Sequence, residues 1–272
     1  MKLFTYGDSW TEGVGGNITE EYTTDIPEEI TIIRQKYCWP TYLSQHLNCE
    51  VKNNGVGGFS NNAIFNTIFY QLKREIITKN DFVVVMWSSS LRDNLPFFPN
   101  EDDFFIWGKR YKSKGHIFKY IFDGITGDNM KYNKAEKNFR NYYIANLFND
   151  TYYDIMNQNY IIHLQFMFKE LGIRYLFCDA FDTMIRKDID IIVDKTQLID
   201  NNRYWGYQTK TMADLLIDTN RKDVWEDNIH WSDIVGKHPN SNGYKFIADE
   251  LFGFINNNNL LYYDETKKSY LI

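Results

Sequence analysis

The sequence predicts an α/β fold: a three-layer α/β/α sandwich in which helices cover both faces of a mostly parallel sheet. Short apolar segments typical of strands alternate along the chain with longer helical segments, as in parallel α/β proteins. One strand segment, FVVVMW at residues 82–87, is apolar throughout, which is typical of a strand buried on both faces. Polar residues and glycines follow the strand segments, at the edge where open α/β sheets bind ligands.

Four segments are predicted to be strands. The first alternates in polarity and ends at Gly7, which suits a strand that leads into a turn. The second ends before Gly55, and the third contains the apolar segment described above. The four predicted strands are residues 2–6, 50–54, 81–87 and 172–178.

Helices are predicted between the strands and after the last one. Pro40 stands in the first turn of the first long helix, where its missing N–H costs nothing. The next helix carries a clear apolar stripe. The predicted helices are residues 39–47, 61–77, 152–171 and 241–255, with a shorter stretch at 27–34 inside a long loop of residues 13–38.

The chain is predicted to form a single domain over residues 1–272. This length supports one large core, and neither an internal repeat nor a low-complexity linker divides it. Residues 94–140 are aromatic, charged and short of β-branched runs, so we expect an insertion or lid packed on the main body. Residues 180–236 give no clear pattern.

Composition excludes several classes of function. The net charge is −6 and no Lys/Arg run occurs, so we expect no nucleic-acid partner. The apolar stretches are far shorter than the ~20 residues of a membrane span, and the N-terminus lacks the pattern of a secretory signal. We therefore expect a cytoplasmic protein without a membrane partner. The odd number of cysteines (Cys38, Cys49, Cys178) fits a reducing compartment.

No metal-ligand spacing is visible among the five histidines and three cysteines, so neither a metal nor another cofactor is expected. Aromatic residues make up 17% of the chain. They fill the core or line a sugar or acyl groove, since ring faces suit sugars. The sequence does not indicate the oligomeric state.

Three sequence blocks resemble those of the GDSL/SGNH hydrolases. They are GDSWTEG at residues 7–13, NGVGG at 54–58 and HPNSNGYKFIA at 238–248, in the order found in that family. The resemblance implies a flavodoxin-like SGNH hydrolase fold. It also implies esterase, lipase, thioesterase or acetyltransferase activity without a cofactor.

The resemblance assigns roles to residues of these blocks. Ser9 is the nucleophile and His238 its general base, because a serine hydroxyl needs a base within hydrogen-bond reach. The N–H groups of Ser9 and Gly58 bind the oxyanion, with Gly57 as the alternative glycine. Asp8 is expected to order the turn rather than to take part in the chemistry.

The third block departs from the family pattern. Where the family has Gly-x-Asn-Asp, this chain has WSSSLR at residues 87–92. Ser90 stands in place of the oxyanion-binding asparagine, or caps the strand end. Arg92 binds an anionic group of the substrate, or forms a structural ion pair. Trp10 and Asn61 are further candidates for substrate binding; Trp10 alternatively packs in the core.

The catalytic acid is the second departure. The family pattern is Asp-x-x-His, but Val235 stands three residues before His238. Asp233, five residues before, is the preferred acid. Asp227 and His230 match the spacing literally, without the Pro-Asn and helix that follow His238, and remain the alternatives. A Ser-His dyad is also open.

These residues predict a serine esterase that removes a small acyl group, such as acetyl, from a carbohydrate or similar polar substrate through an acyl-enzyme. The expected partner is thus a small-molecule or glycan ester. One alternative is an O-acyltransferase acting on a polysaccharide precursor. Another is a catalytically weakened carbohydrate-binding protein. A nucleotide-binding domain is disfavoured because residues 55–58 lack the full GxGxxG pattern.

Overall fold

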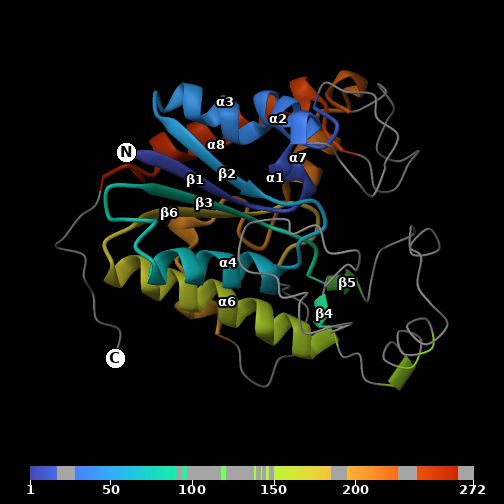
Figure 1. The fold of residues 1–272 in the computed structure, drawn as a ribbon, viewed down its shortest axis with the longest axis vertical. Coiled ribbons are helices and arrows are strands. Elements are labelled where there is room, and N and C mark those ends of the chain that lie inside the picture. Colours follow the sequence, from blue (N-terminus) through green and yellow to red (C-terminus); the bar gives the residue numbers. More distant parts are fainter. Residues whose placement is uncertain are drawn as a thin grey trace.

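A four-stranded parallel sheet forms the middle layer of the protein in the computed structural model (Figure 1). Its strand order is β2-β1-β3-β6. The strands are β1 (Lys2–Gly7), β2 (Glu50–Gly55), β3 (Phe82–Trp87) and β6 (Arg174–Asp179). This arrangement confirms the predicted α/β class and all four predicted strands.

The structure describes the sheet and most of the helices that cover it. The described residues are 1–16, 28–90, 94–96, 118–120, 138, 142, 145, 146, 150–184, 195–225 and 238–262.

The register of the sheet brings the ends of its strands to one level. Gly7 at the end of β1 pairs with Gly55 at the end of β2, and Trp87 of β3 pairs with Asp179 of β6. Loops that leave these strands therefore begin side by side. This edge is the place where the polar residues of the sequence blocks were expected to meet.

Helices cover both faces of the sheet (Figure 1). The predicted long helices are confirmed, with ends shifted by a few residues. One face carries α3 (Trp39–His46), α7 (Met212–Asp218) and α8 (Ser241–Asn257), and the other carries α4 (Asn61–Lys73) and α6 (Asp150–Glu170).

Side chains of strands β1, β3 and β6 alternate between two hydrophobic cores. Leu3 and Val84 contribute to the core under α3 and α8, whereas Phe4 and Val83 contribute to the core under α4 and α6. Every residue of β3 is buried, which explains its uninterrupted apolar sequence.

Shorter elements connect these layers. Two of them are short α-helices, and three are single 3₁₀ turns. They are α1 (Ser9–Glu12), α2 (Glu28–Lys36), η1 (Thr196–Leu198), η2 (Asn201–Arg203) and η3 (Lys222–Val224). Within the predicted insertion the described strands are β4 (Asn94–Pro96) and β5 (Phe118–Tyr120), which pair antiparallel.

Two differences from the prediction have local causes. Helix α4 ends four residues early because Glu75 adopts a left-handed conformation (φ 55°), a common way to end a helix. The unassigned region 180–236 contains α7 and a single parallel bridge from Tyr204 to Phe177 of β6. This bridge extends the edge of the sheet by one residue rather than by a strand, which is why no strand pattern was visible.

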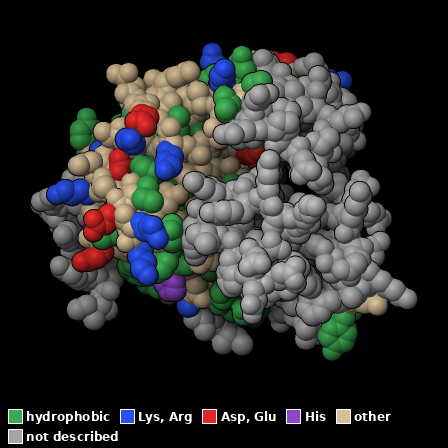
Figure 2. Space-filling model, viewed as in Figure 1, with side chains coloured by type: hydrophobic (Ala, Val, Ile, Leu, Met, Phe, Trp, Pro, Cys, Tyr) green, Lys and Arg blue, Asp and Glu red, His purple; other side chains and the backbone are tan. Residues whose placement is uncertain are grey.

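Acidic and basic side chains are interspersed on the described part of the face shown in Figure 2. Within the described part of the chain, no helix combines the length and hydropathy that crossing a membrane requires.

Candidate active site

Ser9 and His238 meet at the carboxyl edge of the sheet. Ser9 begins α1 directly beyond β1, and His238 precedes α8, 229 positions later. The Nε2 atom of His238 lies 2.9 Å from the Oγ atom of Ser9. His238 is 8% exposed. When the other ring nitrogen carries the proton, Nε2 accepts a hydrogen bond from the serine hydroxyl, which is the arrangement a general base requires.

Asp8 fixes the turn that presents Ser9. One carboxylate oxygen accepts a hydrogen bond from the Trp10 N–H at 3.0 Å and thereby caps α1. The other accepts from the Ser88 hydroxyl at 2.7 Å, beyond the end of β3. The expected turn-ordering role of Asp8 agrees with these contacts. The bond to Ser88 also ties the first sequence block to the third, which no sequence pattern indicated.

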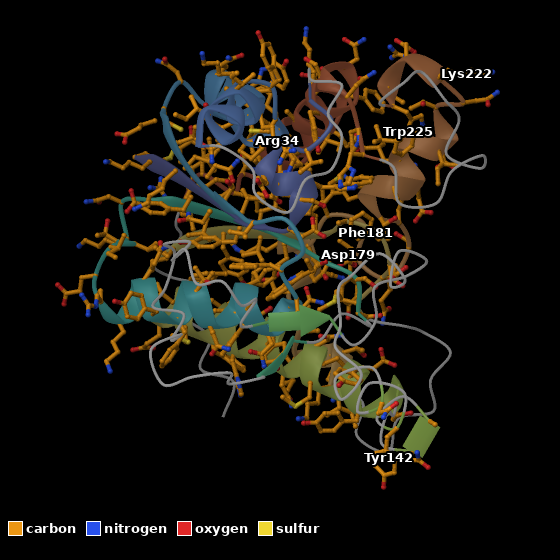
Figure 3. All side chains as sticks on the ribbon, turned by 45° about the vertical axis from the view of Figure 1, so that its right-hand side comes forward. Arg34, Tyr142, Asp179, Phe181, Lys222 and Trp225 are labelled. Carbon is orange, nitrogen blue, oxygen red and sulfur yellow. The ribbon has the colours of Figure 1, made fainter. Side chains whose placement is uncertain are left out.

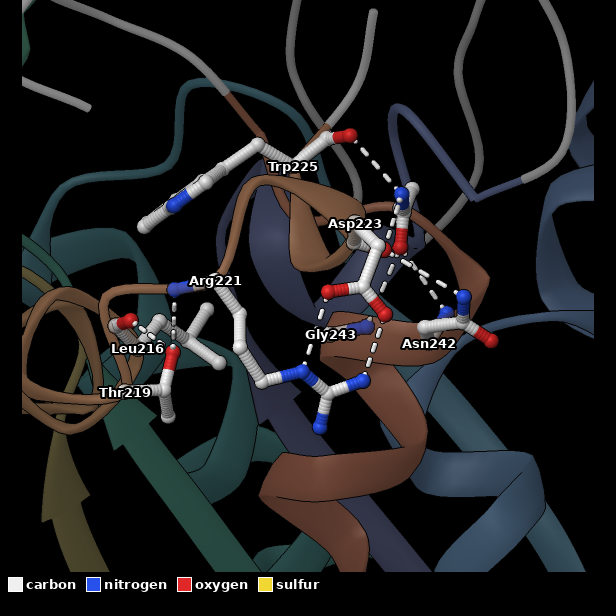
Figure 4. Close-up of polar contacts among 8 residues, drawn as sticks. Leu216, Thr219, Arg221, Asp223, Trp225, Asn242 and Gly243 are labelled. Atoms are coloured by element: carbon white, nitrogen blue, oxygen red, sulfur yellow. Dashed lines mark hydrogen bonds and ion pairs between the residues drawn. The ribbon is translucent and has the colours of Figure 1, made fainter. Parts of the chain in front are cut away.

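His238 is held in place through Asn240, two residues further on. The Asn240 side-chain oxygen caps α8 by accepting from the N–H groups of Asn242 (2.9 Å) and Gly243 (3.1 Å). Its amide nitrogen donates to the backbone carbonyls of Asp223 (2.8 Å) and Trp225 (2.7 Å), as Figure 4 shows. The segment that carries His238 is therefore attached both to α8 and to η3.

The second sequence block forms a tight turn beside Ser9. The Phe59 N–H donates to the Val56 carbonyl at 3.0 Å, and Gly58 has a φ of 81°, as in the third position of a type II turn. A Cβ atom built on Gly57 would lie 3.9 Å from the Ser9 Cβ atom. The Gly57 N–H donates to the Glu12 carboxylate, so the alternative oxyanion role of Gly57 is not supported.

Glu12 and Arg34 are site residues that sequence reasoning missed. Glu12 is 4% exposed and Arg34 is 3% exposed, and the Arg34 Nη1 atom lies 3.5 Å from the second oxygen of the Glu12 carboxylate. Arg34 reaches this position from α2, next to α1 (Figure 3). Glu12 stands within the first block, but nothing in the sequence pairs it with Arg34 or Gly57.

Asn61 lies at the predicted edge but is closed to a substrate. It is 1% exposed, and its side-chain oxygen accepts from the Ser88 N–H at 2.8 Å. Its amide nitrogen donates to the Ser88 and Ser89 carbonyls, both at 3.2 Å. The prediction that Asn61 binds substrate is therefore not supported, because the side chain is committed to shaping the backbone beyond β3.

Ser90 lies beyond β3 and is 3% exposed. Its carbonyl accepts a hydrogen bond from the Asn157 side chain of α6 at 3.2 Å. Its predicted role as an oxyanion donor stays a prediction. The neighbouring Ser89 hydroxyl donates to Asp182 at 2.6 Å, which links this turn to the loop after β6.

Trp10 packs in the core rather than on an accessible wall. It is 0% exposed, and its ring lies edge-on to Phe181 (centroids 4.9 Å apart) and to Trp225 (6.1 Å). Phe181 lies in the loop after β6 and Trp225 at the end of η3 (Figure 3). The predicted substrate contact of Trp10 is not supported, since hydrophobic packing already covers the ring.

Asp179 is a buried acid at the end of β6. Burial raises the pKa of its carboxyl group to about 7, although hydrogen bonds from the Tyr204 hydroxyl (2.6 Å) and the Met184 N–H (3.2 Å) partly oppose this rise. Asp179 holds the loop that carries Phe181 and Asp182.

Four predicted site residues lie outside the described residues: Arg92, Asp227, His230 and Asp233. The candidate acids and the anion-binding arginine therefore stay predictions. Among the residues that the structure describes, no group of three or more His, Cys, Asp or Glu side chains is arranged to hold a metal ion.

Comparisons with solved structures find similar proteins. A G-D-S-L family lipolytic protein from Desulfitobacterium hafniense DCB-2 is 13% identical, with a TM-score of 0.42 over 93% of this chain and 98% of that one. An acetyl xylan esterase from Butyrivibrio proteoclasticus is 14% identical, with a TM-score of 0.43 over 96% of this chain and 65% of that one. No protein-family model and no curated protein matches the sequence. The candidate site is therefore defined by its own geometry and by the three sequence blocks.

Proposed function

We propose that this protein is a serine esterase that removes a small acyl group, such as acetyl, from a carbohydrate or a similar polar molecule. The observation that carries the proposal is the 2.9 Å contact between Ser9 Oγ and His238 Nε2. A serine and a histidine 229 positions apart lie in hydrogen-bond contact at the edge of a sheet where α/β proteins bind ligands.

The proposed reaction has two halves. Ser9 Oγ attacks the ester carbonyl carbon while His238 Nε2 takes the hydroxyl proton, and the oxyanion forms beside the N–H groups of Ser9 and Gly58. The imidazolium then gives this proton to the leaving alcohol as the ester C–O bond breaks. Water, deprotonated by the same imidazole, attacks the acyl-serine. The imidazolium returns this proton to Ser9 Oγ as the acyl C–Oγ bond breaks, which releases the carboxylic acid and the free serine.

The proposed substrate class rests on the resemblance of the three sequence blocks. The polar side chains of Asp8, Asn61 and Ser88 at the strand ends are hydrogen-bonded within the protein. An acyltransferase would use the same acyl-enzyme with a sugar hydroxyl in place of water, so the two are separated by the acceptor that the product carries.

The test compares the wild-type protein with Ser9→Ala on p-nitrophenyl esters of increasing acyl length and on acetylated sugars. Ser9→Ala should lower kcat/KM by about 1,000-fold or more, since the acyl-enzyme cannot form. Ser44→Ala is the matched control, because the Ser44 hydroxyl only bonds the Thr41 carbonyl within α3.

A fluorophosphonate probe gives a second readout. It should label the wild-type protein and Ser44→Ala at Ser9 and leave Ser9→Ala unlabelled. A folded wild-type protein that neither turns over an ester nor takes the label would refute the esterase and favour a binding protein.

A further inference from the structure

We propose that Glu12 is a positioning residue that sets the oxyanion-binding turn, residues 56–59, relative to Ser9. The inference rests on the proposed esterase function. It assigns to a buried carboxylate a role that goes beyond the nucleophile, the base and the glycine donor.

Glu12 contacts both the turn and Arg34. One Glu12 carboxylate oxygen accepts the Gly57 N–H, and the other faces the Arg34 guanidinium at 3.5 Å. Both side chains are almost fully buried. A hydrogen bond from a peptide N–H to an ionised carboxylate is short and strong, and low exposure protects it from competing water.

The N–H groups on either side of Gly58 are both hydrogen-bonded. Phe59 donates to the Val56 carbonyl, which closes the turn, and Gly57 donates to Glu12. The peptide between these two carries the Gly58 N–H, the proposed oxyanion donor. Because both neighbouring peptides are anchored, the orientation of the Gly58 N–H is fixed by them.

Ser9 and Glu12 lie on the same short helix. Glu12 lies on α1, the four-residue helix that begins with Ser9. The nucleophile and the anchor of the turn therefore move together, and a Cβ built on Gly57 would already lie 3.9 Å from the Ser9 Cβ atom. A shift of the turn by about 1 Å at such a site can lower a rate by about 100-fold.

Arg34 supplies a countercharge for the buried Glu12 carboxylate. A buried carboxylate without a countercharge is costly, and a cation from α2 offsets that cost without occupying the oxygen that accepts from Gly57. Arg34 is thus expected to permit the arrangement, whereas the acceptor atom of Glu12 performs the positioning.

The sharpest test is a pair of double variants that both remove the two charges. Glu12→Gln/Arg34→Met keeps an oxygen that can accept from Gly57, whereas Glu12→Met/Arg34→Met has none at the same side-chain length. We expect Glu12→Met/Arg34→Met to lose about 10- to 100-fold in kcat with KM within about 2-fold, because the oxyanion contact acts in the transition state. Glu12→Gln/Arg34→Met should stay within about 5-fold of the wild-type kcat.

Tyr6→Phe controls for general loss of stability. The Tyr6 hydroxyl makes a buried hydrogen bond to Gln71 at 2.6 Å, on the strand that leads to Ser9. Its loss should lower the melting temperature and leave kcat and KM near wild-type values.

The outcomes separate the two proposals. Equal kcat values in the two double variants, both folded by circular dichroism, would overturn the role of Glu12 and leave the esterase intact. A fall in kcat that tracks melting temperature across all variants, Tyr6→Phe included, would also overturn it. An inactive wild-type protein would refute the esterase and this inference together.

Discussion

The polar groups at the strand ends near Ser9 and the groups that hold His238 differ in their exposure to solvent. The strand-end cluster, defined as Asp8, Asn61, Ser88 and Asp179, has exposed fractions of 0–1%. The histidine segment is defined as residues 221–225 and 238–243. Several of the hydrogen bonds that hold it are exposed to solvent. Its Arg221–Asp223 ion pair has side chains that are 50% and 51% exposed.

This difference in solvent exposure determines how much each contact contributes to the free energy of unfolding. A buried polar group that loses its partner retains the cost of leaving water, whereas an exposed group exchanges its partner for water at little cost. Substitutions in the strand-end cluster should therefore lower the free energy of unfolding of the whole protein. Changes in the histidine segment should affect mainly the position of the imidazole.

The largest effect is expected at Asp179 as a function of pH. Its folded pKa of about 7 lies above the ordinary value of 3.8, so between these pH values the folded protein keeps a proton that the unfolded chain releases. Stability should thus fall as pH rises from about 4 to 7, by on the order of 4 kcal/mol from this group alone.

Denaturant unfolding at several pH values, for the wild-type protein and Asp179→Asn, measures this contribution. The amide does not titrate, so the wild-type protein should lose stability relative to the variant as pH rises to 7 and change little beyond it. Parallel pH profiles for the two proteins would show that Asp179 keeps its ordinary acidity and that the cluster is better hydrated than its exposed fraction indicates.

The next largest effect is expected at Asp8. Asp8→Ala removes the cap of α1 and takes from the Ser88 hydroxyl its buried acceptor, a loss of about 2–4 kcal/mol in the free energy of unfolding. Asp8→Asn retains an oxygen for the Trp10 N–H and an amide that can donate to Ser88, so it should lose about 1 kcal/mol or less. Chemical denaturation gives both values, and similar losses in the two variants would contradict this account.

A smaller effect on stability is expected at Asn240. Asn240→Ala loses the cap of α8, at about 1 kcal/mol, together with the bonds to the Asp223 and Trp225 carbonyls. Asn240→Asp keeps the capping oxygen and loses only those bonds. The two variants should differ in melting temperature but share a fall in kcat of about 10-fold, since both release the segment that carries His238. Wild-type kcat in Asn240→Asp would show that the helix cap alone holds the histidine.

The smallest effect is expected at Asp223. Its hydrogen bond to Arg221 lowers the pKa of the Asp223 carboxyl group, but both side chains are exposed. The atom that binds Asn240 and Asn242 is the backbone carbonyl of Asp223 (Figure 4). Asp223→Asn should therefore leave melting temperature and activity unchanged. A measurable loss in either quantity would mean that the exposed ion pair contributes to the position of the histidine segment.

The fold was predictable from the sequence because its signals are local. Apolar runs such as that of β3 and the stripe of α4 follow from periodicity within one element. The four-residue helix α1 was missed, since four residues are too few to show a period. The boundaries of α4 differ because a single left-handed residue, Glu75, ends it.

The site was predictable only where a block of sequence carries it. Ser9, Gly58 and His238 stand in such blocks, and the structure brings Ser9 and His238 into contact. Trp10 and Asn61 were expected to face a substrate, but both are buried, because exposure depends on what packs against a side chain rather than on its neighbours in the chain.

The sequence by itself determined the order of strands and helices along the chain, the glycines of the tight turns and the two separate blocks that contain Ser9 and His238, since each of these depends on residues close to one another along the chain. Only the tertiary structure decided that Asp8 binds Ser88, that Glu12 joins Arg34 to the Gly57 turn and that Asn240 ties α8 to η3. Each of these contacts joins segments from different elements. Their geometry is set by how parallel strands end at one level and how the surrounding side chains exclude water.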